Sequence, residues 1–271
     1  MNDIDNFLKE DLGLEGDITS DSLFSEEEGY AKIITKQDCV VAGLEEMVII
    51  FKKTGAEVKL KIVEGSFIKK NTVISEIYGP VRSILKAERL ALNFLGRMSG
   101  IATKTKELVD LCKKINPNVT IAATRKTTPG FRKFEKKAVF IGGGETHRFG
   151  LFDAVLIKDN HLKVFGSVEE AIKKVKEKIK NKTIEIEVEN EKDALASAKI
   201  GVDVIMLDNM DAETAEKIAE KIRQINPKIL IEISGGITRE NIEKFASFAN
   251  RVSLGCLTHS VKNIDFSLEM K

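Results

Sequence analysis

Polar residues that could perform chemistry follow six short apolar segments in the second half of the chain. They lie in the stretches Thr124-Arg125-Lys126, Lys158-Asp159-Asn160-His161, Glu187-Val188-Glu189, Asp208-Asn209, Ser234-Gly235-Gly236 and Gly255. Arginine binds carboxylates and phosphates through paired hydrogen bonds, and lysine neutralises phosphate charge. Only nine arginines occur in the chain, and Arg125, Arg132 and Arg148 fall within 24 residues. The sequence therefore predicts a site for an anionic substrate.

Carboxylates are expected at the same site. In the segment TIEIEVE (183–189), alternation places Glu185, Glu187 and Glu189 on the face opposite the isoleucines. A solvated strand face would produce the same pattern, but it is at odds with a buried parallel sheet. Buried carboxylates are costly unless cations pair with them. The candidate partners are Lys126, Arg125, Arg148, Lys158 and a metal ion.

Further features extend this site toward phosphate. Lys158 shares the parity of Ala154 and Leu156, so that its side chain is also expected to point inward. Glu187 and Asp208, at the ends of two neighbouring segments, could hold Mg²⁺, which in turn binds a polyphosphate. The segments Gly142-Gly143-Gly144 and Ser234-Gly235-Gly236 could bind phosphate through backbone N–H groups, although tight turns would also explain the glycines.

The elements that position these residues alternate between β segments and amphipathic helices. The β segments are VTIAAT (119–124), AVLIKD (154–159), TIEIEVE (183–189), DVIMLDN (203–209), ILIEISG (229–235) and RVSLG (251–255). Helices are expected after Ser167, where Ser167 and Glu170 form a plausible capping box, and after Asp211, where apolar residues share one face. Alternation of this kind predicts a parallel sheet. Six such segments with helices between them fit an incomplete barrel of the TIM type better than a dinucleotide-binding fold, because no GxGxxG motif follows a strand.

The first part of the chain has a different texture. Short β-branched segments between about residues 30 and 80 surround a helix that ends at Gly55, and a helix over about 84–115 follows, with a possible break near Ser99-Gly100. We therefore expect an α/β protein with an N-terminal α/β sandwich domain with its connecting helix (1–116) and a β/α barrel (117–258). The tail 259–271 is expected to pack back on the N-terminal domain.

Composition excludes several classes of protein. Forty-three basic and 42 acidic residues give a net charge of +1, so that nothing indicates a nucleic-acid partner. No apolar run reaches the ~20 residues of a membrane span, and the acidic N-terminus lacks the features of a signal peptide. Cys39, Cys112 and Cys256 are widely spaced, which argues against a disulfide scaffold and favours the cytoplasm.

Several motifs together resemble the quinolinate phosphoribosyltransferase family. They are GDITS (16–20), ERLALNFLGRMSGIAT (88–103), TRKTTPGFR (124–132), KKAVFIGGGETHRFGLFDAVLIKDNH (136–161), LDN (207–209), ISGGI (233–237) and LGCLTHS (254–260). The resemblance covers almost the whole chain in order. It implies an α/β sandwich domain, an open β/α barrel, and a reaction that joins quinolinate to 5-phosphoribosyl-1-pyrophosphate (PRPP). The products would be nicotinate mononucleotide, pyrophosphate and CO₂, on the de novo route to NAD.

The resemblance also implies roles for individual residues. Arg125, Arg148 and Lys158, with His147 nearby, match the residues that receive the quinolinate carboxylates. Lys126 and Lys158 would face the ribose phosphate chemistry, and Glu187 and Asp208 match the acids near the ribose hydroxyls and the Mg²⁺–pyrophosphate. The catalytic set is thus Lys126, Lys158, Glu187 and Asp208. The positions matching the remaining substrate contacts, most of them the grip on the 5′-phosphate, are Thr124, Ser234, Gly235, Gly236, Leu254, Gly255 and Cys256.

The resemblance further implies a cofactor and an assembly. Mg²⁺ is required in this family, held by Glu187 and Asp208 directly or through PRPP or water. Arg89 matches an arginine that a neighbouring subunit delivers, which implies a homodimer with shared sites, or a larger assembly such as a hexamer. No position in the matched motifs departs from the family pattern.

Three alternatives remain at this stage. A sibling enzyme with another substrate would show an altered LIKDNH segment, which is intact here. An aldolase could form a Schiff base on Lys158 at a strand end. The segment GSFIKKNTVISEIYGP (65–80) has the look of a biotinyl carrier domain, but it lacks an MKM turn for modification and is assigned to the sandwich domain.

Overall fold

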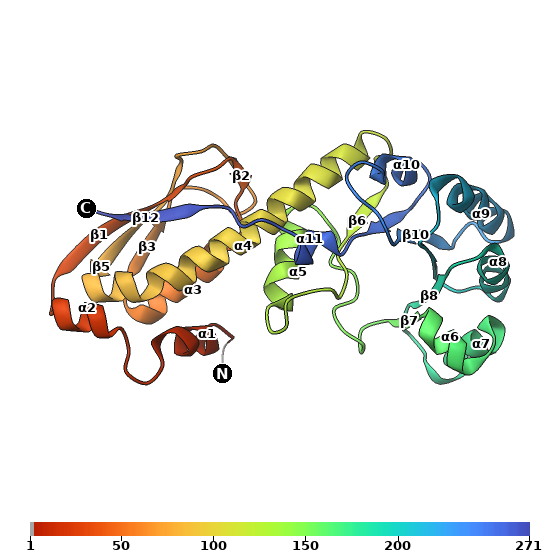
Figure 1. Cartoon of the computed structure of the whole chain (residues 1–271), viewed down its shortest axis with the longest axis horizontal. Coiled ribbons are helices and arrows are strands. Elements are labelled where there is room, and N and C mark those ends of the chain that lie inside the picture. The colour runs from red at the N-terminus through yellow and green to blue at the C-terminus, as the bar shows by residue number, and fades with distance from the viewer. Residues whose placement is uncertain (1–2) are drawn as a thin grey trace. The chain divides into compact units, whose positions relative to one another are not determined.

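The chain folds into two compact units, each with its own main sheet (Figure 1). The structure is a computed structural model that describes residues 3–271. One unit comprises the chain up to Lys106 together with Thr128–Gly143 and Ser260–Lys271; we call it the N-terminal unit. The other, the barrel unit, comprises Glu107–Thr127 and Gly144–His259. Within the described range, no helix has the length and apolar character needed to cross a membrane.

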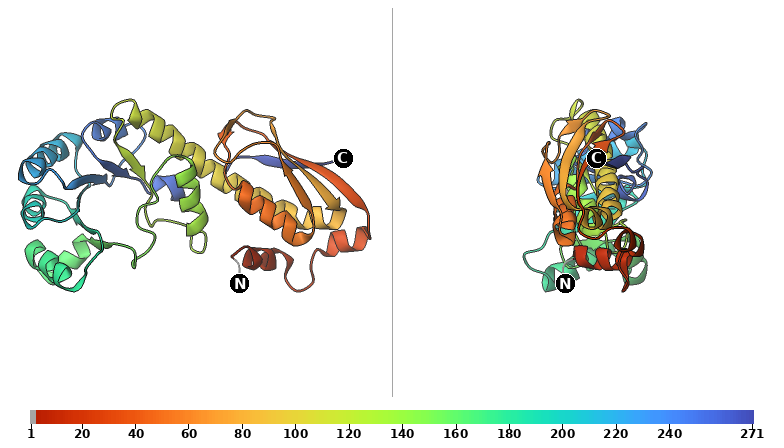
Figure 2. Two further views of the ribbon diagram at one scale, coloured as in Figure 1. Left: turned by 180° about the vertical axis from the view of Figure 1, so that it is seen from behind. Right: turned by 90° about the vertical axis from the view of Figure 1, so that its left-hand side faces the viewer.

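The sheet of the N-terminal unit is antiparallel, with the order β12-β1-β5-β3. Its strands are β1 (Glu28–Thr35), β3 (Glu57–Leu60), β5 (Val73–Pro80) and β12 (Phe266–Met270). Along β1, the alternating residues Ala31, Ile33 and Thr35 are buried, as expected for a strand with one covered face. The C-terminal tail thus enters this unit as the edge strand β12 (Figure 2). The segment 65–80 supplies β5 and the short strand β4 (Phe67–Ile68), which pairs with β2 (Cys39–Val40).

The N-terminal unit also contains the helices α1 (Asp3–Leu12), α2 (Ile18–Leu23) and α3 (Leu44–Thr54), and the part of the long α4 (Val81–Lys113) that extends to Lys106. Helix α3 buries Leu44, Met47, Ile50 and Phe51, which recur at helical spacing. It ends at Gly55, whose φ of 99° lies in the left-handed region that favours glycine, as predicted.

Helix α4 is continuous, and the predicted break near Ser99-Gly100 is wrong. A Cβ atom at Gly96 would lie 2.8 Å from the carbonyl oxygen of Ile264, and one at Gly100 would clash with the carbonyl oxygen of Lys262. Ser99 is buried, and its hydroxyl accepts from the N–H of Ala42 at 3.0 Å. These small residues therefore admit a neighbouring backbone and do not interrupt the helix.

The segment Thr128–Gly143, expected within the barrel, belongs to the N-terminal unit. Its helix α5 (Arg132–Ile141) is anchored by aromatic packing, because the rings of Phe131 and Phe134 lie 4.9 and 4.8 Å from that of Phe94. Arg97 of α4 also donates to the buried Glu135 at 2.7 Å. The chain thus leaves the barrel after its first strand and returns to it at Gly144.

The barrel unit is built on a six-stranded sheet with the order β6-β11-β10-β9-β8-β7, in which every pair is parallel. The strands are β6 (Thr120–Ala122), β7 (Val155–Ile157), β8 (Ile184–Val188), β9 (Val204–Asp208), β10 (Leu230–Ser234) and β11 (Arg251–Ser253). In the described part of the chain, β6 and β7 lie at the two edges of this sheet, so that the barrel is open. The predicted fold class is confirmed.

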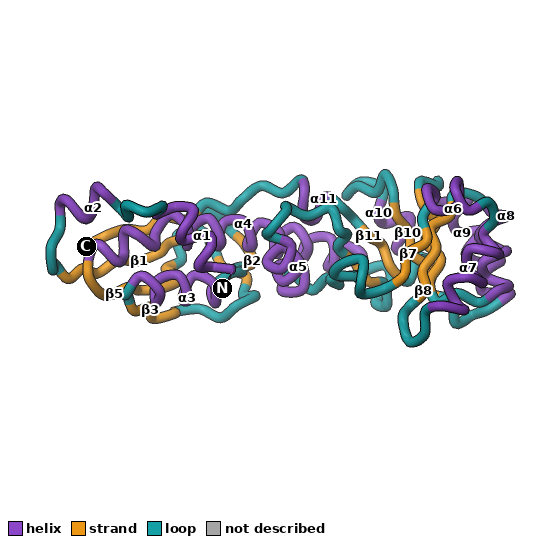
Figure 3. Tube along the Cα trace, turned by 90° about the horizontal axis from the view of Figure 1, so that it is seen from below, coloured by secondary structure: helices purple, strands orange, loops and turns teal. Residues whose placement is uncertain are grey.

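Helices follow the strands of the barrel unit: α6 (Asp159–Phe165), α7 (Val168–Lys178), α8 (Glu191–Ile200), α9 (Ala212–Ile225), α10 (Ile242–Ala246) and α11 (Cys256–His259). Figure 3 shows α7, α8 and α9 along the outer side of the sheet. The predicted cap at Ser167 is present, since its side chain accepts from the N–H of Glu170, and Asp211 also caps its helix by accepting from the N–H of Thr214. Because these helices cover the outside, alternate strand residues face the barrel interior.

Candidate active site

A cavity of about 560 Å³ lies in the barrel unit, at the carboxyl ends of the strands. Strand register sets its rim, because Ser234 pairs with Asp208 and Glu187 with Met206. Of the predicted substrate residues, those that line it are Thr124, Arg125, Lys126, His147, Arg148, Lys158, Glu187, Asp208, Ser234, Gly235, Gly236, Leu254, Gly255 and Cys256. Arg89 does not line it; this residue belongs to the N-terminal unit, and two thirds of its side chain is exposed.

The cavity also contains residues to which the sequence assigned no role. They are Ala123, Leu156, Met206, Glu232, Ile237, Thr238, Ser253 and His259. Glu232 shares the parity of Ser234 on its strand, which was the available signal for an inward side chain. His259 was visible as one of only three histidines. The apolar members carry no signal in the sequence that separates them from ordinary core residues.

One wall of the cavity is cationic. Arg148 is buried, and its guanidinium donates to the carbonyl of Ala154 at 3.4 Å. Burial lowers the pKa of Arg148, and the neighbouring charge of Arg125 lowers it further. The Nε atom of Arg125 is buried with no hydrogen-bond partner among residues 3–271. Two arginines held this close repel each other and are stabilised by an anion placed between them.

Carboxylates line the same cavity. Lys158 donates to the largely buried Glu187 at 2.5 Å, so that this acid has the cationic partner predicted from the sequence. Asp208 is half-buried, and burial raises its pKa above the ordinary range. Asn209 donates to Asp208 at 2.7 Å. His161, at the end of the LIKDNH motif, accepts the backbone N–H of Lys158 at 2.9 Å and so fixes the loop that carries the lysine.

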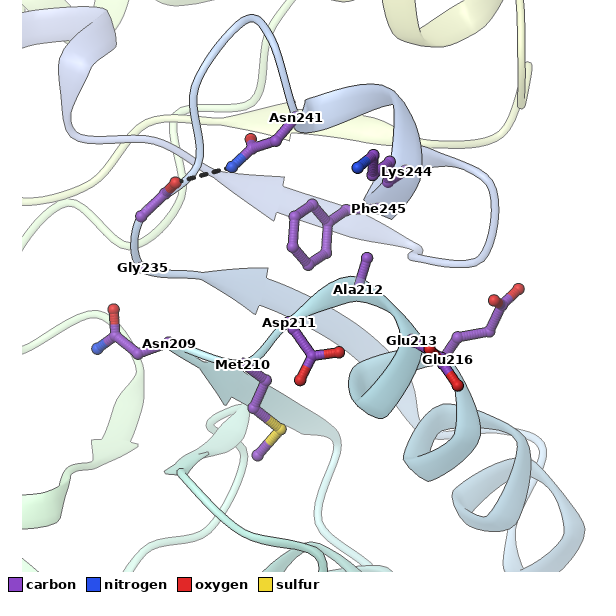
Figure 4. A pocket seen from close by; sticks show the side chains of 11 residues that line it. Asn209, Met210, Asp211, Ala212, Glu213, Glu216, Gly235, Asn241, Lys244 and Phe245 are labelled. Carbon is purple, nitrogen blue, oxygen red and sulfur yellow. Dashed lines mark hydrogen bonds between the residues drawn. The ribbon is translucent and has the colours of Figure 1, made fainter.

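The glycine loop between β10 and α10 has the backbone geometry of an anion cradle. Gly235 and Gly236 have φ values of 82° and 62°, in the left-handed region. A Cβ atom at Gly235 would lie 2.7 Å from the backbone nitrogen of Asn209, so that only glycine fits there. Asn241 fixes the loop, because its side chain donates to the carbonyl of Gly236 at 3.0 Å (Figure 4). The same side chain accepts from the N–H of Thr238 at 2.8 Å.

A second cavity, of about 670 Å³, is lined by this loop and by residues of α9 and α10 (Figure 4). Its charged lining residues are mostly acidic: Asp211, Glu213, Glu216 and Lys244. Gly235 and Gly236 line both cavities. An anionic substrate therefore fits the first cavity, where the arginines and lysines gather.

The residues predicted to hold Mg²⁺ suit an indirect site. Mg²⁺ is commonly bound by one or two carboxylates together with substrate phosphates and water. Glu187 and Asp208 both line the cavity, but no third acid, histidine or cysteine completes a cluster around them in the described residues. The donor set fits an ion that arrives with a polyphosphate.

The parallel β/α sheet, the polar strand ends and the glycine loop define a β/α-barrel enzyme that acts on a phosphorylated, anionic substrate. Two family models match the chain: "Quinolinate phosphoribosyl transferase, N-terminal domain" over residues 17–99 and "Quinolinate phosphoribosyl transferase, C-terminal domain" over residues 101–269. The chain belongs to the quinolinate phosphoribosyltransferase family.

Individual proteins agree with this assignment. The chain is 44% identical to a probable carboxylating nicotinate-nucleotide pyrophosphorylase of Archaeoglobus fulgidus, over 89% of this chain and 93% of that protein. It is 41% identical to the Bacillus subtilis protein of the same name, over 98% and 92%. The crystal structure of nicotinate-nucleotide pyrophosphorylase from Ehrlichia chaffeensis is similar, with a TM-score of 0.92 and 36% identity, over 99% of this chain and 97% of that one.

Proposed function

We propose that this protein transfers the phosphoribosyl group of PRPP to quinolinate with loss of CO₂ and so forms nicotinate mononucleotide and pyrophosphate in NAD biosynthesis. The observation that carries this proposal is one cavity that joins a paired-arginine wall, an acidic wall and a glycine loop. Members of the matched family supply the reaction class. The LIKDNH segment, in which His161 accepts the backbone N–H of Lys158 at 2.9 Å, is intact, which favours this reaction over that of a sibling enzyme with another substrate.

Quinolinate is proposed to bind at the cationic wall. Its two carboxylates would be received by Arg125 and Arg148, with Lys158 and His147 beside them. Guanidinium groups match carboxylates in two-point contacts, which orients the pyridine ring as well as neutralising it. A substrate with one carboxylate would leave part of this charge uncompensated.

The phosphoribosyl group is proposed to bind at the glycine loop. Ser234, Gly235 and Gly236 would hold the 5′-phosphate through backbone N–H groups, together with Gly255 after β11. A side chain at Gly255 would displace the side chains of Lys126 and His259, because a Cβ atom there would lie 2.9 Å from Lys126 and 2.8 Å from His259. Thr124, Leu254 and Cys256 flank these contacts, and Lys126 extends toward the leaving pyrophosphate.

Bond breaking at the ribose leaves positive charge on the anomeric carbon. Glu187 and Asp208 would stabilise that charge directly or through the ribose hydroxyls, while Lys126 and Lys158 stabilise the departing pyrophosphate. Mg²⁺, when bound with PRPP, supplies further neutralisation of the pyrophosphate. The quinolinate nitrogen forms the new bond to the anomeric carbon. The resulting pyridinium accepts the electron pair of the C–CO₂ bond at position 2, and a proton then replaces the lost CO₂.

Two further properties are proposed. Arg89 would complete the site of a neighbouring subunit in a homodimer, with a hexamer as a possible larger assembly; its exposed side chain on α4 supports this role. The three cysteines are all free, in keeping with a cytoplasmic location. For Arg89, Arg89→Ala subunits can be mixed with Lys158→Ala subunits. A shared site predicts recovered activity after subunit exchange, because each mixed dimer has one intact site; a mixture that stays inactive contradicts it.

The aldolase alternative is disfavoured by the environment of Lys158. Its side-chain nitrogen is engaged in a hydrogen bond to Glu187 at 2.5 Å, and the chain belongs to a phosphoribosyltransferase family. The proposed function is tested by incubating the protein with PRPP, Mg²⁺ and either quinolinate or nicotinate. We expect CO₂ and pyrophosphate in equal amounts from quinolinate and little turnover of nicotinate. Equal turnover of the two acids would contradict the proposal.

A further inference from the structure

A cluster of buried charges lies at the inner end of the substrate cavity. The Nε2 atom of His147 lies 3.3 Å from Oε2 of Glu185 on β8 and 3.3 Å from Oε2 of Glu232 on β10. The three side chains are 8%, 3% and 0% exposed, respectively. His147 and Glu232 also line the cavity. The imidazole therefore lies at the surface of the cavity in which we propose that substrate binds, in contact with the carboxylates of Glu185 and Glu232.

Arg251 of β11 anchors this cluster. Its guanidinium donates to Glu232 at 2.9 Å and binds Glu145 through two contacts, at 2.8 and 3.0 Å. The backbone of Glu145 is itself paired with β6, through hydrogen bonds to Ile121 and Ala123 of 2.8 Å each. Glu145 precedes His147 by two residues, so that the segment carrying the histidine is fixed through both its backbone and a side chain.

The backbone of His147 is in an unusual conformation for its residue type. Its φ of 53° lies in the left-handed region, which carries a steric cost for residues with a Cβ atom. Such conformations persist where the surroundings hold them, and they are concentrated at functional sites. Here the anchored Glu145 restrains the segment, and Nε2 of the ring lies 3.3 Å from each of the two carboxylates, although this atom forms no hydrogen bond within the described residues.

Charge balance favours a protonated histidine. Arg251 pairs directly with Glu145 and Glu232, the charge of Arg148 acts on Glu185, and His147 lies against both Glu185 and Glu232. Buried carboxylates are costly unless cations pair with them. Burial opposes a charge on His147, but Glu185 and Glu232 outweigh it and raise the pKa of His147 to about 9. Burial would raise the pKa of Glu232, yet His147 and Arg251 lower it. The other charged groups around the cavity are Arg125, Lys126, Arg148, Lys158, Glu187, Asp208 and His259.

A metal ion is the competing occupant. The ligand atoms of His147, Glu185 and Glu232 lie within 4.8 Å of one another, which is close enough to surround a cation. However, Oε2 of Glu232 already accepts from Arg251, and a divalent cation there would lie beside a guanidinium. A proton on the imidazole satisfies the same carboxylates without that repulsion.

We propose that Glu232, anchored by Arg251, is a positioning residue that keeps His147 in the imidazolium form, so that His147 is a fixed cation of the substrate cavity and favours substrates with two carboxylates. The part of this inference that concerns substrate rests on the proposed function. The protonation of His147 does not depend on it and is measured separately.

The first test measures the ring protonation of His147 directly. The chain has only three histidines, so that ¹⁵N-labelled imidazole signals of the full-length protein are few, and a His147→Asn variant identifies those of His147. We expect a midpoint near pH 9 in the unmodified protein. Glu232→Gln should lower it by about one unit or more, because one carboxylate is lost. A midpoint near 6.5 in the unmodified protein, or no change in the variant, overturns the proposal.

Glu135→Gln is the matched control. Glu135 is also a fully buried carboxylate paired with an arginine, but it belongs to the N-terminal unit. The Glu135→Gln substitution should leave the titration midpoint of His147 unchanged. If it shifts that midpoint as much as Glu232→Gln does, the shift reflects a general loss of structure and the proposal is contradicted. If Glu232→Gln does not fold, Glu185→Gln removes the other carboxylate and keeps the Arg251 pair, with the same expected direction. Zn²⁺ that perturbs the His147 signals at a one-to-one ratio would indicate a metal site and also overturn the proposal.

The second test separates positioning from stability by kinetics. In Glu232→Gln, we expect the KM for quinolinate to rise by about tenfold between pH 6 and pH 8.5, with a smaller change in kcat, because the cation is lost as His147 deprotonates. The unmodified protein and Glu135→Gln should show a flatter KM over that range. A uniform loss of kcat at all pH values would contradict the positioning role. If quinolinate is not a substrate at all, the proposed function fails while the ring titration still decides the protonation of His147.

Discussion

Each unit buries an arginine–glutamate pair, and the two pairs differ in how completely their polar atoms are satisfied. In the N-terminal unit, Glu135 accepts from Arg97 at 2.7 and 3.1 Å and from the side chain and backbone of Thr128 at 3.0 Å each. In the barrel unit, Arg251 binds Glu232 at 2.9 Å, but the Oε1 atoms of Glu232 and Glu185 find no hydrogen-bond partner in the described chain. In the first pair, both carboxylate oxygens of Glu135 accept hydrogen bonds. In the second, carboxylate oxygens without hydrogen-bond partners in the described chain lie near the cavity.

This difference indicates what each cluster contributes. A buried ion pair with all its hydrogen bonds made holds neighbouring segments together, and the Arg97–Glu135 pair links α4 to α5 in this way. Unsatisfied buried groups cost stability, and they are found where function uses the charge. We therefore expect substitutions of Arg97 or Glu135 to change mainly the free energy of unfolding. Substitutions of residues that line the cavity at the carboxyl ends of the barrel strands should change mainly activity.

The largest expected effect is on stability in the N-terminal unit. Glu135→Ala leaves Arg97 without its partner and should lower the free energy of unfolding by about 3–5 kcal/mol. Chemical denaturation at neutral pH measures this change. Glu213→Ala is the control, because the Glu213–Lys217 pair is exposed and should contribute about 0.5 kcal/mol or less. Similar losses in the two variants would contradict the structural role of the buried pair.

The next largest effect is expected in turnover. Asp208→Asn should lower kcat by about 10²–10³-fold, because one group that stabilises charge in the transition state is lost. Quinolinate affinity, measured by calorimetry, should change by no more than about twofold. Asp211→Asn is the matched control: Asp211 caps α9 three residues later, and asparagine caps a helix as well as aspartate. A collapse of quinolinate affinity with normal turnover would show that the role of Asp208 is misassigned.

The elements of the fold were largely predictable, and the long-range contacts were not. Period-two alternation placed Glu185 and Glu187 on the inner face of β8, and both are buried there. Residues 128–143 were assigned to the wrong unit, because the ring contact between Phe94 and Phe134 joins segments far apart in the sequence. Local patterns carry no information about such packing.

The same limit applies to the site. Residue type and strand ends identified the cavity residues after β6, β7, β8, β9 and β10, since parallel strands bring their carboxyl ends together. The Glu232–Arg251 pair was missed, because it joins neighbouring strands whose register the sequence does not specify. The role proposed for Arg89 remains a prediction, as it concerns a second subunit.

A third prediction concerns pH. The pKa of His147 is raised from 6.5 to about 9, so that its contribution to stability is fully present below about pH 6.5 and is lost as the pH rises through about 9. At about 1.4 kcal/mol per unit, this contribution is about 3 kcal/mol. The free energy of unfolding should therefore fall over this range, and it should fall less in Glu232→Gln. Parallel curves for the two proteins would contradict the coupling between these residues.

The smallest expected effect concerns the glycine loop. Asn241→Ala removes the two hydrogen bonds that fix Gly236 and Thr238, and should raise the KM for PRPP by about 3–10-fold, or about 1 kcal/mol. The KM for quinolinate should stay nearly constant. Asn226→Ala is the control, since Asn226 makes a similar turn contact with Lys228 before β10 begins. A similar rise in the KM for quinolinate would contradict the assignment of this loop to binding the phosphate of PRPP.

The positive charge of the cavity at the carboxyl ends of the barrel strands is tested most directly by calorimetric titration of the unmodified protein with quinolinate and with nicotinate at pH 7.5. The two ligands share a pyridine ring and differ in one carboxylate. Because the same cavity is lined by Arg125, Arg148, His147 and Lys158, we predict that quinolinate binds at least about tenfold more tightly than nicotinate. Equal affinity for the two acids would contradict a cavity built for two carboxylates.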